Sequence, residues 1–439
     1  MSALSIPFIP TVKFDVLIVG AGMVGASLAC ALGDKCNPAN RSLKVGVIES
    51  KADCLKGHFG DDGRASAIAL GSSYIWQNIG VWDGMKQRSV TPMHTVQISD
   101  GDFPHQVQLQ RDDMGKEALG FIVENAVTQA SLWEFMQQCH NIDVICPARI
   151  TDIEYLQAAD RMQVKISSGS GEQILETKLL VGADGGRSVV RELAHIPVSE
   201  RLYEQTCIVV TVKSEHSHKN IAYERFQQSG PFAILPLESD RCCIVWTATR
   251  DETPDLLALS ETDFMQALKQ RFGKPLLASL GKLSLESRTR ASYVPRWMHS
   301  KTYIQPRLAL IGDAAHTTHP VAGQGVNLGI RDVAVLAEVA IAAHQQGEDL
   351  GSMAVLKRYQ SRRWWDNLGV ILLTHVTNRL FSNQNWLPQG LRRFGLLALA
   401  TLLPAKKVLM FLMMGLHQTR EVRPARDREP QAVVNSARS

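Results

Sequence analysis

The most constraining feature of the chain lies near its N-terminus, where an apolar run leads into three closely spaced glycines. The segment reads FDVLIVGAGMVGASLACAL and predicts a buried strand, a tight turn and an alanine-rich helix. Gly20, Gly22 and Gly25 have the GxGxxG spacing of a turn whose backbone approaches a pyrophosphate at the positive end of a helix. The residues between these glycines belong to the same expected contact surface: Ala21, Met23 and Val24.

A second strand supports a dinucleotide site at this turn. The segment KVGVIES is short and apolar, and it ends in Glu49, whose carboxylate would accept hydrogen bonds from the hydroxyls of an adenosine ribose. The alternative is a glycine turn that only packs the helix on the strand. Strand, turn, helix, second strand and terminal acid in this order favour the dinucleotide site, which is either an NAD or an FAD site.

Two later segments repeat the pattern of a strand followed by turn residues and a helix. The first is LLVGADGGRSVVRELA, with Asp184 in a DG turn, and the second is LALIGDAAHTTHPVAGQGVNLGIRD. The loop in the second segment is small, rich in glycine and followed by a helix N-terminus. These features favour a flat, partly anionic ligand that lies against the backbone.

These segments, in this order, resemble the class A flavoprotein aromatic hydroxylases, whose fold is similar to that of para-hydroxybenzoate hydroxylase. Within that group, the chain resembles the ubiquinone-biosynthesis hydroxylases of the UbiH, UbiI and UbiF kind and their mitochondrial counterpart, over residues 14–366. Further matching segments are DGRASAIALGSSYIWQNIGVWD, GFIVENAVTQASLW, GPFAILPL and RCCIVWT. GPFAILPL and HPVAGQGVNLGIRD place the chain nearest to UbiH, which acts on polyprenyl methoxyphenol.

The resemblance implies an α/β fold in which a Rossmann-like FAD-binding domain carries an inserted antiparallel substrate sheet and a helical C-terminal region. The alternating patterns CIVVTVKSE, IAYERFQQ and RCCIVWTATR predict the strands of that sheet. Its candidate pocket walls are Phe232, Ile234, Leu235 and Trp246, each of which is alternatively a core residue. We expect FAD-binding parts at 1–83, 117–198 and 298–375, substrate-sheet parts at 84–116 and 199–297, C-terminal helices at 376–420 and a disordered tail at 421–439.

The resemblance also implies FAD as cofactor, NAD(P)H as transient electron donor and O2 as co-substrate. Gly312 and Asp313 would bind the ribityl chain, because a carboxylate at a strand end can accept hydrogen bonds from sugar hydroxyls. Pro320 would face the isoalloxazine, and Arg64 would approach the FAD, unless it is a solvated ion-pair residue. The backbone N–H groups expected at flavin N1 and O2 belong to Gly325, Val326 and Asn327.

Polar residues near these motifs have competing interpretations. His319, beside the flavin-facing proline, is a candidate to orient or deprotonate a phenol, whereas we interpret His316 as structural. Arg187 and Arg191 lie near phosphate or form structural pairs. Many relatives have an arginine where this chain has Ala126, so no FAD contact is expected there.

The expected function is hydroxylation of a polyprenylated phenol ring in ubiquinone biosynthesis, at the ring position used by UbiH-like enzymes. A UbiI- or UbiF-like ring position is the alternative within the family. Other possibilities are a polyprenyl reductase or halogenase on the same scaffold, and a non-catalytic FAD-binding subunit of a quinone-synthesis complex. The DG and GD motifs argue against a simple NAD dehydrogenase.

Composition narrows the remaining classes. The eight cysteines show neither CxxC spacing nor a paired framework, so we expect reduced thiols, no metal site and a cytoplasmic protein. The net charge is +4, and the chain from Leu391 onward contains nine Lys or Arg but only three Asp or Glu. No matching fold signal accompanies this basic region, so nucleic-acid binding is not expected. The segment LRRFGLLALATLLPAKKVLMFLMMGL has two interpretations. It is either an interfacial helix, which contacts the inner face of a membrane or a complex partner, or a helix that packs on the enzyme's own core.

Overall fold

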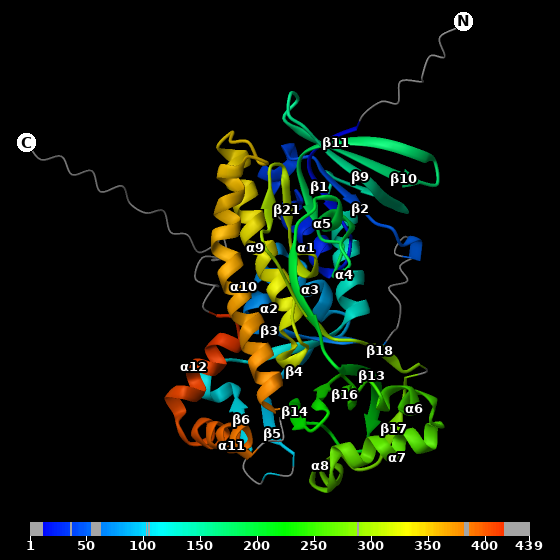
Figure 1. Ribbon diagram of the computed structural model, residues 1–439, viewed down its shortest axis with the longest axis vertical. Coiled ribbons are helices and arrows are strands. Elements are labelled where there is room, and N and C mark those ends of the chain that lie inside the picture. The colour runs from blue at the N-terminus through cyan, green and yellow to red at the C-terminus, as the bar shows by residue number, and fades with distance from the viewer. Residues whose placement is uncertain are drawn as a thin grey trace, which may run out of the picture.

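The computed structural model describes residues 12–416 apart from residues 36, 54–62, 102, 104–105, 288 and 382–385. Figure 1 shows a parallel sheet with its helices in the upper half and a second sheet with its own helices in the lower half. The predicted α/β class with a helical C-terminal region is confirmed. The tail predicted at 421–439 lies outside the described residues.

The upper sheet is built on the strand, turn and helix that the glycine spacing predicts. Its strand order is β20-β21-β11-β1-β2-β8, and the five strands from β21 to β8 are mutually parallel. An antiparallel meander formed by β9 and β10 leads into β11. The bounds are β1 Val12–Val19, β2 Val45–Ile48, β8 Ile142–Ile145, β9 Ala148–Leu156, β10 Arg161–Ser168, β11 Gly171–Gly182, β20 Ile304–Gln305 and β21 Leu308–Leu310.

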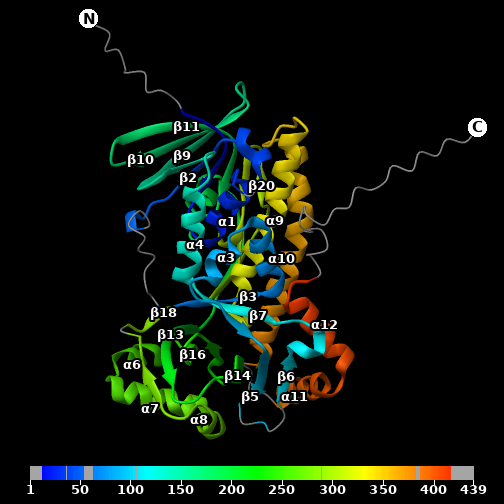
Figure 2. The same cartoon turned by 180° about the vertical axis from the view of Figure 1, so that it is seen from behind.

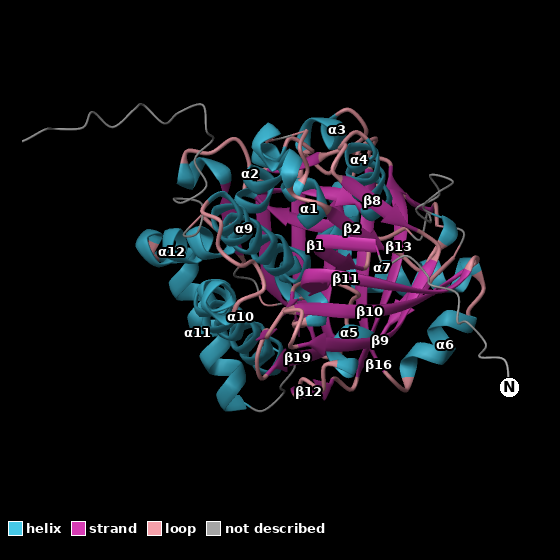
Figure 3. Cartoon of the chain, turned by 90° about the horizontal axis from the view of Figure 1, so that it is seen from above, coloured by secondary structure: helices cyan, strands magenta, loops and turns pink. Residues whose placement is uncertain are grey.

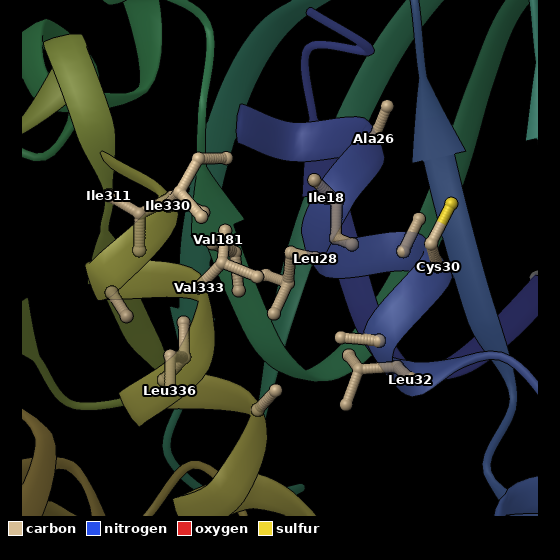
Figure 4. Packing of buried hydrophobic residues seen from close by; sticks show 14 of the residues in the cluster. Ile18, Ala26, Leu28, Cys30, Leu32, Val181, Ile311, Ile330, Val333 and Leu336 are labelled. Carbon is tan, nitrogen blue, oxygen red and sulfur yellow. The ribbon is translucent and has the colours of Figure 1, made fainter. Parts of the chain in front are cut away.

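Two helices cover one face of this sheet and bury its apolar side chains. They are α1 (Met23–Leu32) and α9 (Gln324–Gln345), which directly follow the two glycine-rich loops. Figure 4 shows Leu28 of α1 and Val333 of α9 pointing toward each other, with Val181 of β11 beside them. The shared core fixes both helix N-termini relative to the sheet. The neighbouring helices are α2 Leu70–Ile79, α3 Trp82–Lys86, α4 Asn125–Gln137 and α5 Val189–Leu193.

The lower sheet combines strands from two separated stretches of the chain, in the order β17-β13-β16-β15-β14-β5-β6, with β18 paired to β13. All of its pairs are antiparallel except β14 with β5, which is parallel. The antiparallel strands predicted from the alternating patterns are therefore present. The bounds are β5 Thr95–Asp100, β6 Val107–Gln110, β13 Gln205–Ser214, β14 Ile221–Gln227, β15 Gly230–Pro236, β16 Arg241–Thr249, β17 Leu283–Leu285 and β18 Ala291–Tyr293.

The two faces of the lower sheet have different roles. One face packs against α6 (Glu252–Ala258), α7 (Glu261–Phe272) and α8 (Lys274–Leu280), and the other faces the upper half of the molecule. Three of the four candidate pocket walls, Phe232, Ile234 and Trp246, are buried in the core beneath these helices. For these three residues, the pocket-wall interpretation is wrong and the core interpretation is right.

Two small sheets join the halves of the molecule. One has the order β3-β7-β4, and the other has the order β12-β19-β22 and contains residues of the GD loop. These two sheets thereby connect the glycine-rich loops of the upper half to the lower sheet. The bounds are β3 Ala65–Ala69, β4 Thr91–Met93, β7 Gly120–Glu124, β12 Val198–Leu202, β19 Arg296–Ser300 and β22 His316–Thr317.

The C-terminal helices are α10 (Met353–Phe381), α11 (Trp386–Thr401) and α12 (Leu403–Met413). Figures 2 and 3 show α11 and α12 on one side of the molecule, with α11 beside β6. Arg392 of α11 donates to the Asp100 carboxylate of β5 over 2.9 Å, which ties the helices to the lower sheet. Within the described residues, no single helix is long and apolar enough to cross a bilayer, and the apolar parts of α11 and α12 pass that test only as a pair bent by 101°.

Candidate active site

A cavity of about 740 Å³ lies where the two halves of the molecule meet, a size typical of ligand sites. Its upper wall consists of the loops before α1 and α9, and its lower wall consists of the inward face of the second sheet. Ten of the residues predicted from the sequence line it: Gly22, Met23, Val24, Arg64, Leu235, Asp313, Pro320, Gly325, Val326 and Asn327.

Close backbone packing fixes the first glycine loop. Gly20 has φ = +101°, and its N–H donates to the Ile48 carbonyl over 2.8 Å. A Cβ at Gly25 would lie 1.9 Å from the Gly20 carbonyl oxygen, so this position excludes any side chain. A Cβ at Gly22, by contrast, would meet no described heavy atom within 4 Å beyond its chain neighbours. The loop is therefore closely packed at Gly20 and Gly25 and open toward the cavity at Gly22.

Glu49 lies at the end of β2, as the sequence predicts, but it does not line the cavity. One carboxylate oxygen accepts the Ala21 N–H over 2.8 Å, and the other accepts the Lys51 N–H over 2.8 Å. The carboxylate therefore braces the glycine loop in addition to any contact with a ribose. Gly20, Ala21, Gly25, Asp184, Gly312 and His319 also lie outside the cavity lining.

A buried ionic network holds the GD turn. The carboxylate of Asp332, in α9, accepts the Gly312 N–H over 3.0 Å and contacts His316 Nε2 over 2.6 Å. Its other oxygen accepts bonds from Arg363 Nε over 2.8 Å and Asn367 Nδ2 over 3.0 Å. Burial raises the pKa of Asp332, but the charges of His316 and Arg363 outweigh burial and lower it well below its usual range. His316 thus has a structural partner, in agreement with its structural interpretation.

Asp313 points into the space beside this network. Its side chain is exposed, and the solvent it meets is that of the cavity. The surrounding protein raises the pKa of Asp313 by desolvation, and the charges of His316 and Arg296 oppose the rise. A carboxyl group in this setting is suited to accept hydrogen bonds from ligand hydroxyls.

The first turn of α9 lines the cavity with Gly325, Val326 and Asn327. Gly323 precedes the helix with φ = +58°, and Gly325 leaves its surroundings open, because a Cβ there would meet no described heavy atom within 4 Å. The Asn327 side chain accepts the Ala69 N–H and donates to the carbonyls of Ala67 and Gly323, each over 2.8 Å. Sequence reasoning missed this link between β3 and the helix start.

The DG and GD turns are joined by two arginines. Arg191 donates to the carbonyls of Ala314 over 2.8 Å and Gly186 over 3.0 Å, and Arg296 also donates to the Gly186 carbonyl. Asp184 caps α5 by accepting the Val190 N–H over 3.1 Å, while its other oxygen is buried without a partner among the described atoms. Of the two predicted alternatives for Arg191, the structure supports the structural pairing.

His319 is fully buried behind Pro320 rather than in the cavity wall. Its Nδ1 accepts the Val321 N–H over 3.3 Å, and its Nε2 lies 3.2 Å from Gln205 Oε1. Burial and the nearby His375 lower the pKa of His319 to about 3, so the ring is neutral near pH 7. The acid–base role of His319 stays a prediction, and these bonds favour a role in positioning the proline.

The lower wall of the cavity contains residues that sequence reasoning did not select. They include Glu224 of β14 and Tyr293 of β18, whereas Leu235 of β15 lines this wall as the sequence predicted. At the end nearest α2, the cavity is closed by α12 and the turn after it, where the Met414 carbonyl accepts the Gly71 N–H over 2.8 Å. The residues that close this end are Met410, Met413 and Met414.

The comparisons with known proteins agree with this geometry. The sequence profile of the FAD binding domain family matches residues 13–365. A ubiquinone hydroxylase, UbiL, of Rhodospirillum rubrum is 39% identical over 91% of this chain and 89% of its own length. The chain belongs to the FAD-dependent hydroxylase family of UbiH, UbiI and UbiF. It is thus an FAD-dependent monooxygenase of ubiquinone biosynthesis, as the sequence predicted.

Two further comparisons place this hydroxylase among its relatives. The 3-demethoxyubiquinol 3-hydroxylase of Escherichia coli is 32% identical over 80% of this chain and 86% of its own length. The crystal structure of p-nitrophenol 4-monooxygenase from Pseudomonas putida superposes with a TM-score of 0.74 at 19% identity, covering 94% of this chain and all of that one. This second likeness concerns the fold.

The residues of the upper wall fit the FAD of this family. Gly22 and Gly325 leave open space where side chains would obstruct a ligand, and Asp313 directs an acceptor into that space. The N–H groups at the start of α9 lie at the positive end of the helix dipole and suit an electron-rich ring edge. Among the described residues, no group of three or more His, Cys, Asp or Glu has an arrangement suited to a metal ion.

Proposed function

We propose that the hydroxylase adds a hydroxyl group to the ring of a polyprenylated phenol in ubiquinone biosynthesis, at the position used by UbiH-like enzymes on 2-polyprenyl-6-methoxyphenol. The ring positions of UbiI- and UbiF-like enzymes are the alternative. One observation carries the proposal. A single cavity is bordered above by the glycine loops and the start of α9, and below by the apolar sheet face and the methionines of α12.

The upper wall would hold the cofactor. FAD, once reduced by NAD(P)H, activates O2 for transfer of one oxygen atom to the ring. Asp313 would accept hydrogen bonds from the ribityl chain, and Pro320 would lie against the isoalloxazine. The N–H groups of Gly325, Val326 and Asn327 and the dipole of α9 would stabilise negative charge on the reduced ring. Arg64, which directly precedes β3 and lines the cavity, would approach the cofactor.

The lower wall would hold the ring and exclude water from it. Leu235, Val245 and Ala233 present apolar side chains from adjacent strands, and Met410 and Met413 add flexible ones. An apolar compartment suits a substrate that carries a long hydrocarbon tail. It would also limit loss of activated oxygen to solvent.

An apolar surface on the C-terminal helices supports contact with a membrane. Arg379 and Lys407 are exposed beside it, and basic residues next to apolar ones favour anionic lipid. We propose that the enzyme is cytoplasmic, lies on the inner face of a membrane through this surface, and draws its prenylated substrate from there, directly or through a complex partner. This apolar C-terminal surface consists of Trp365, Leu372, Leu373, Val376, Phe394, Leu397, Leu402, Leu403, Val408, Phe411 and Leu412, each at least 38% exposed.

The catalytic proposal is tested with purified protein. A flavin absorbance spectrum is recorded, anaerobic reduction by NAD(P)H is followed with and without a short-chain prenylated methoxyphenol, and O2 is then admitted. We expect faster reduction with the phenol and a product heavier by one oxygen atom. Bound FAD that neither nucleotide reduces would instead indicate a non-catalytic FAD-binding subunit.

The membrane proposal has its own test. Sedimentation with vesicles that contain anionic phospholipid should capture the wild-type protein and lose most of the Val408→Glu variant, because a charge on this face opposes insertion. Leu202→Glu is the matched control, since Leu202 is 53% exposed on β12, outside the C-terminal helices. Equal capture of all three proteins would contradict the proposal.

A further inference from the structure

Glu224 is a carboxylic acid in an otherwise apolar part of the cavity wall. It lies in β14, where its backbone pairs with Ala233 of β15 on one side and Ile98 of β5 on the other. Its side chain lines the cavity and is half-buried. Because side chains alternate along a strand, Glu224 faces the same way as Ala222, which lines the cavity and packs with Leu235 and Val245.

No ion pair or hydrogen bond compensates this carboxyl group within the described part of the chain. The titratable groups on this side of the cavity include Cys207 of β13, which the charge of Glu224 affects, and Tyr293 of β18, which neighbours Cys207; Arg64, which precedes β3, lies near Tyr293. On β5, the Asp100 carboxylate is already paired with Arg392 and Arg393. A buried carboxyl group without a partner is unfavourable, so its presence in a ligand cavity suggests a role with the ligand.

Glu224 is also the group in the lower wall best suited to exchange a proton near neutral pH. Burial raises the pKa of Glu224 to about 7. Burial also raises the pKa of Cys207 to about 11 and the pKa of Tyr293 well above its usual range, so both stay protonated. Asp313, another carboxyl group in the cavity lining, lies in the upper wall at the GD turn.

We propose that Glu224 accepts the hydrogen bond of the substrate's ring hydroxyl and then its proton. The inference rests on the proposed function, because it requires a phenol in the cavity. The phenol O–H bond breaks, the proton passes to a carboxylate oxygen of Glu224, and the electron pair stays on the phenol oxygen. The ring thereby becomes more electron-rich and accepts an electrophilic oxygen atom more readily. The proton returns to solvent when the product leaves.

The test compares the wild-type enzyme with Glu224→Gln, which keeps the shape of the side chain but cannot take up the proton. The visible spectrum of bound FAD reports whether the variant is folded. The matched control is Glu172→Gln, an exposed glutamate at the outer end of β11. Two readouts are used: kcat/KM between pH 5.5 and 8.5 (roughly the range over which such a group titrates), and the affinity for the prenylated phenol relative to its methyl ether.

We expect Glu224→Gln to lower kcat/KM for hydroxylation about 100-fold at pH 8. In the wild type and in Glu172→Gln, kcat/KM should rise with pH through about 7, and this rise should be absent in Glu224→Gln. Wild-type enzyme should bind the phenol about 10-fold more tightly than its methyl ether, and Glu224→Gln should weaken this preference, because a neutral amide oxygen accepts a weaker hydrogen bond than a carboxylate. Glu224→Asp should recover part of the rate.

The possible failures are distinguishable. A wild-type enzyme that converts and binds none of the phenols overturns the proposed function, and the inference with it. A wild-type enzyme that hydroxylates the phenol overturns the inference alone if folded Glu224→Gln keeps both the pH profile and the preference for the phenol. A variant that has lost FAD is replaced by Glu224→Asp, for which an unchanged pH profile and preference would also overturn the inference.

Discussion

The two walls of the cavity are built in different ways. The upper wall is mostly backbone and contains two kinds of glycine. At Gly25 the packed backbone leaves no room for a side chain, whereas Gly22 and Gly325 leave open space where a side chain would otherwise stand. The lower wall is made of side chains that project from strands, such as Glu224 and Leu235, and from a helix, such as Met413. A wall of backbone restricts which residues can occupy it far more than a wall of side chains, which fits a common cofactor above and a variable substrate below.

The largest expected effect tests the backbone wall. Gly25→Ala places a Cβ 1.9 Å from the Gly20 carbonyl oxygen, so the turn cannot keep its conformation. We expect FAD affinity to fall by about 100-fold or more, since the phosphate site depends on this turn. Gly84→Ala is the control, because its Cβ would make ordinary contacts at 3.8 Å. Titration of apoprotein with FAD measures the effect, and equal affinity in both variants would contradict the described packing.

The network behind the same wall provides the second prediction. Asp332→Asn removes the fully buried carboxylate that Arg363 shares with His316 and leaves Arg363 only its pair with Asp366, so it should lower the free energy of unfolding by about 3–5 kcal/mol. Glu338→Gln should change it by less than about 1 kcal/mol, because the pair of Glu338 with Arg362 lies at the solvent-accessible surface. Urea denaturation measures both, and similar losses would show that the buried network is not what stabilises the turn.

This network also has a pH signature. Because the folded-state pKa of Asp332 is lowered below its unfolded value of about 4, its stabilisation is present above that pH and is lost as the pH falls further. The free energy of unfolding should therefore decline less steeply below about pH 4 in Asp332→Asn than in the wild type.

The third prediction separates the two faces of the lower sheet. Ile234→Ala removes a fully buried side chain beneath α7 and should destabilise the protein by about 2–5 kcal/mol, with little change in KM for the phenol. Leu235→Ala changes the cavity face, so we expect a higher KM for the phenol and a smaller loss of stability. Denaturation and steady-state kinetics measure the pair, and the opposite pattern would reverse the assignment of the faces.

Residues 234 and 235 also show which parts of the structure can be predicted from the sequence. The glycine motifs predicted the upper wall, including the start of α9, because few residue types satisfy that backbone. Both faces of the lower sheet are buried, so the sequence could not decide whether residue 234 or residue 235 faces the cavity, nor select Glu224 among the alternating residues of β14. The Asn327 bonds to β3 and the closure by α12 join segments far apart in the chain, and no local pattern predicts them.

The fourth and smallest effect concerns His319, which is buried behind Pro320 and outside the cavity lining. Its folded-state pKa of about 3 lies below the unfolded value of about 6.5, so the unfolded state takes up the proton first as the pH falls. Stability should therefore fall from about pH 6.5 downward, by about 1–2 kcal/mol at pH 5. His319→Gln should remove this slope, and the exposed His216→Gln should keep it. A slope unchanged in both variants would show that His319 is not buried in its neutral form.

The most direct test of a hydroxylase with one cavity for cofactor and phenol is to follow the oxygen atom. The FAD-bound protein is supplied with NAD(P)H, a short-chain prenylated methoxyphenol and O2 labelled with the heavy oxygen isotope, and the product is analysed by mass spectrometry. We predict one labelled oxygen atom on the ring of the product. Consumption of NAD(P)H and O2 that yields only hydrogen peroxide, or a product with unlabelled oxygen, would contradict this function.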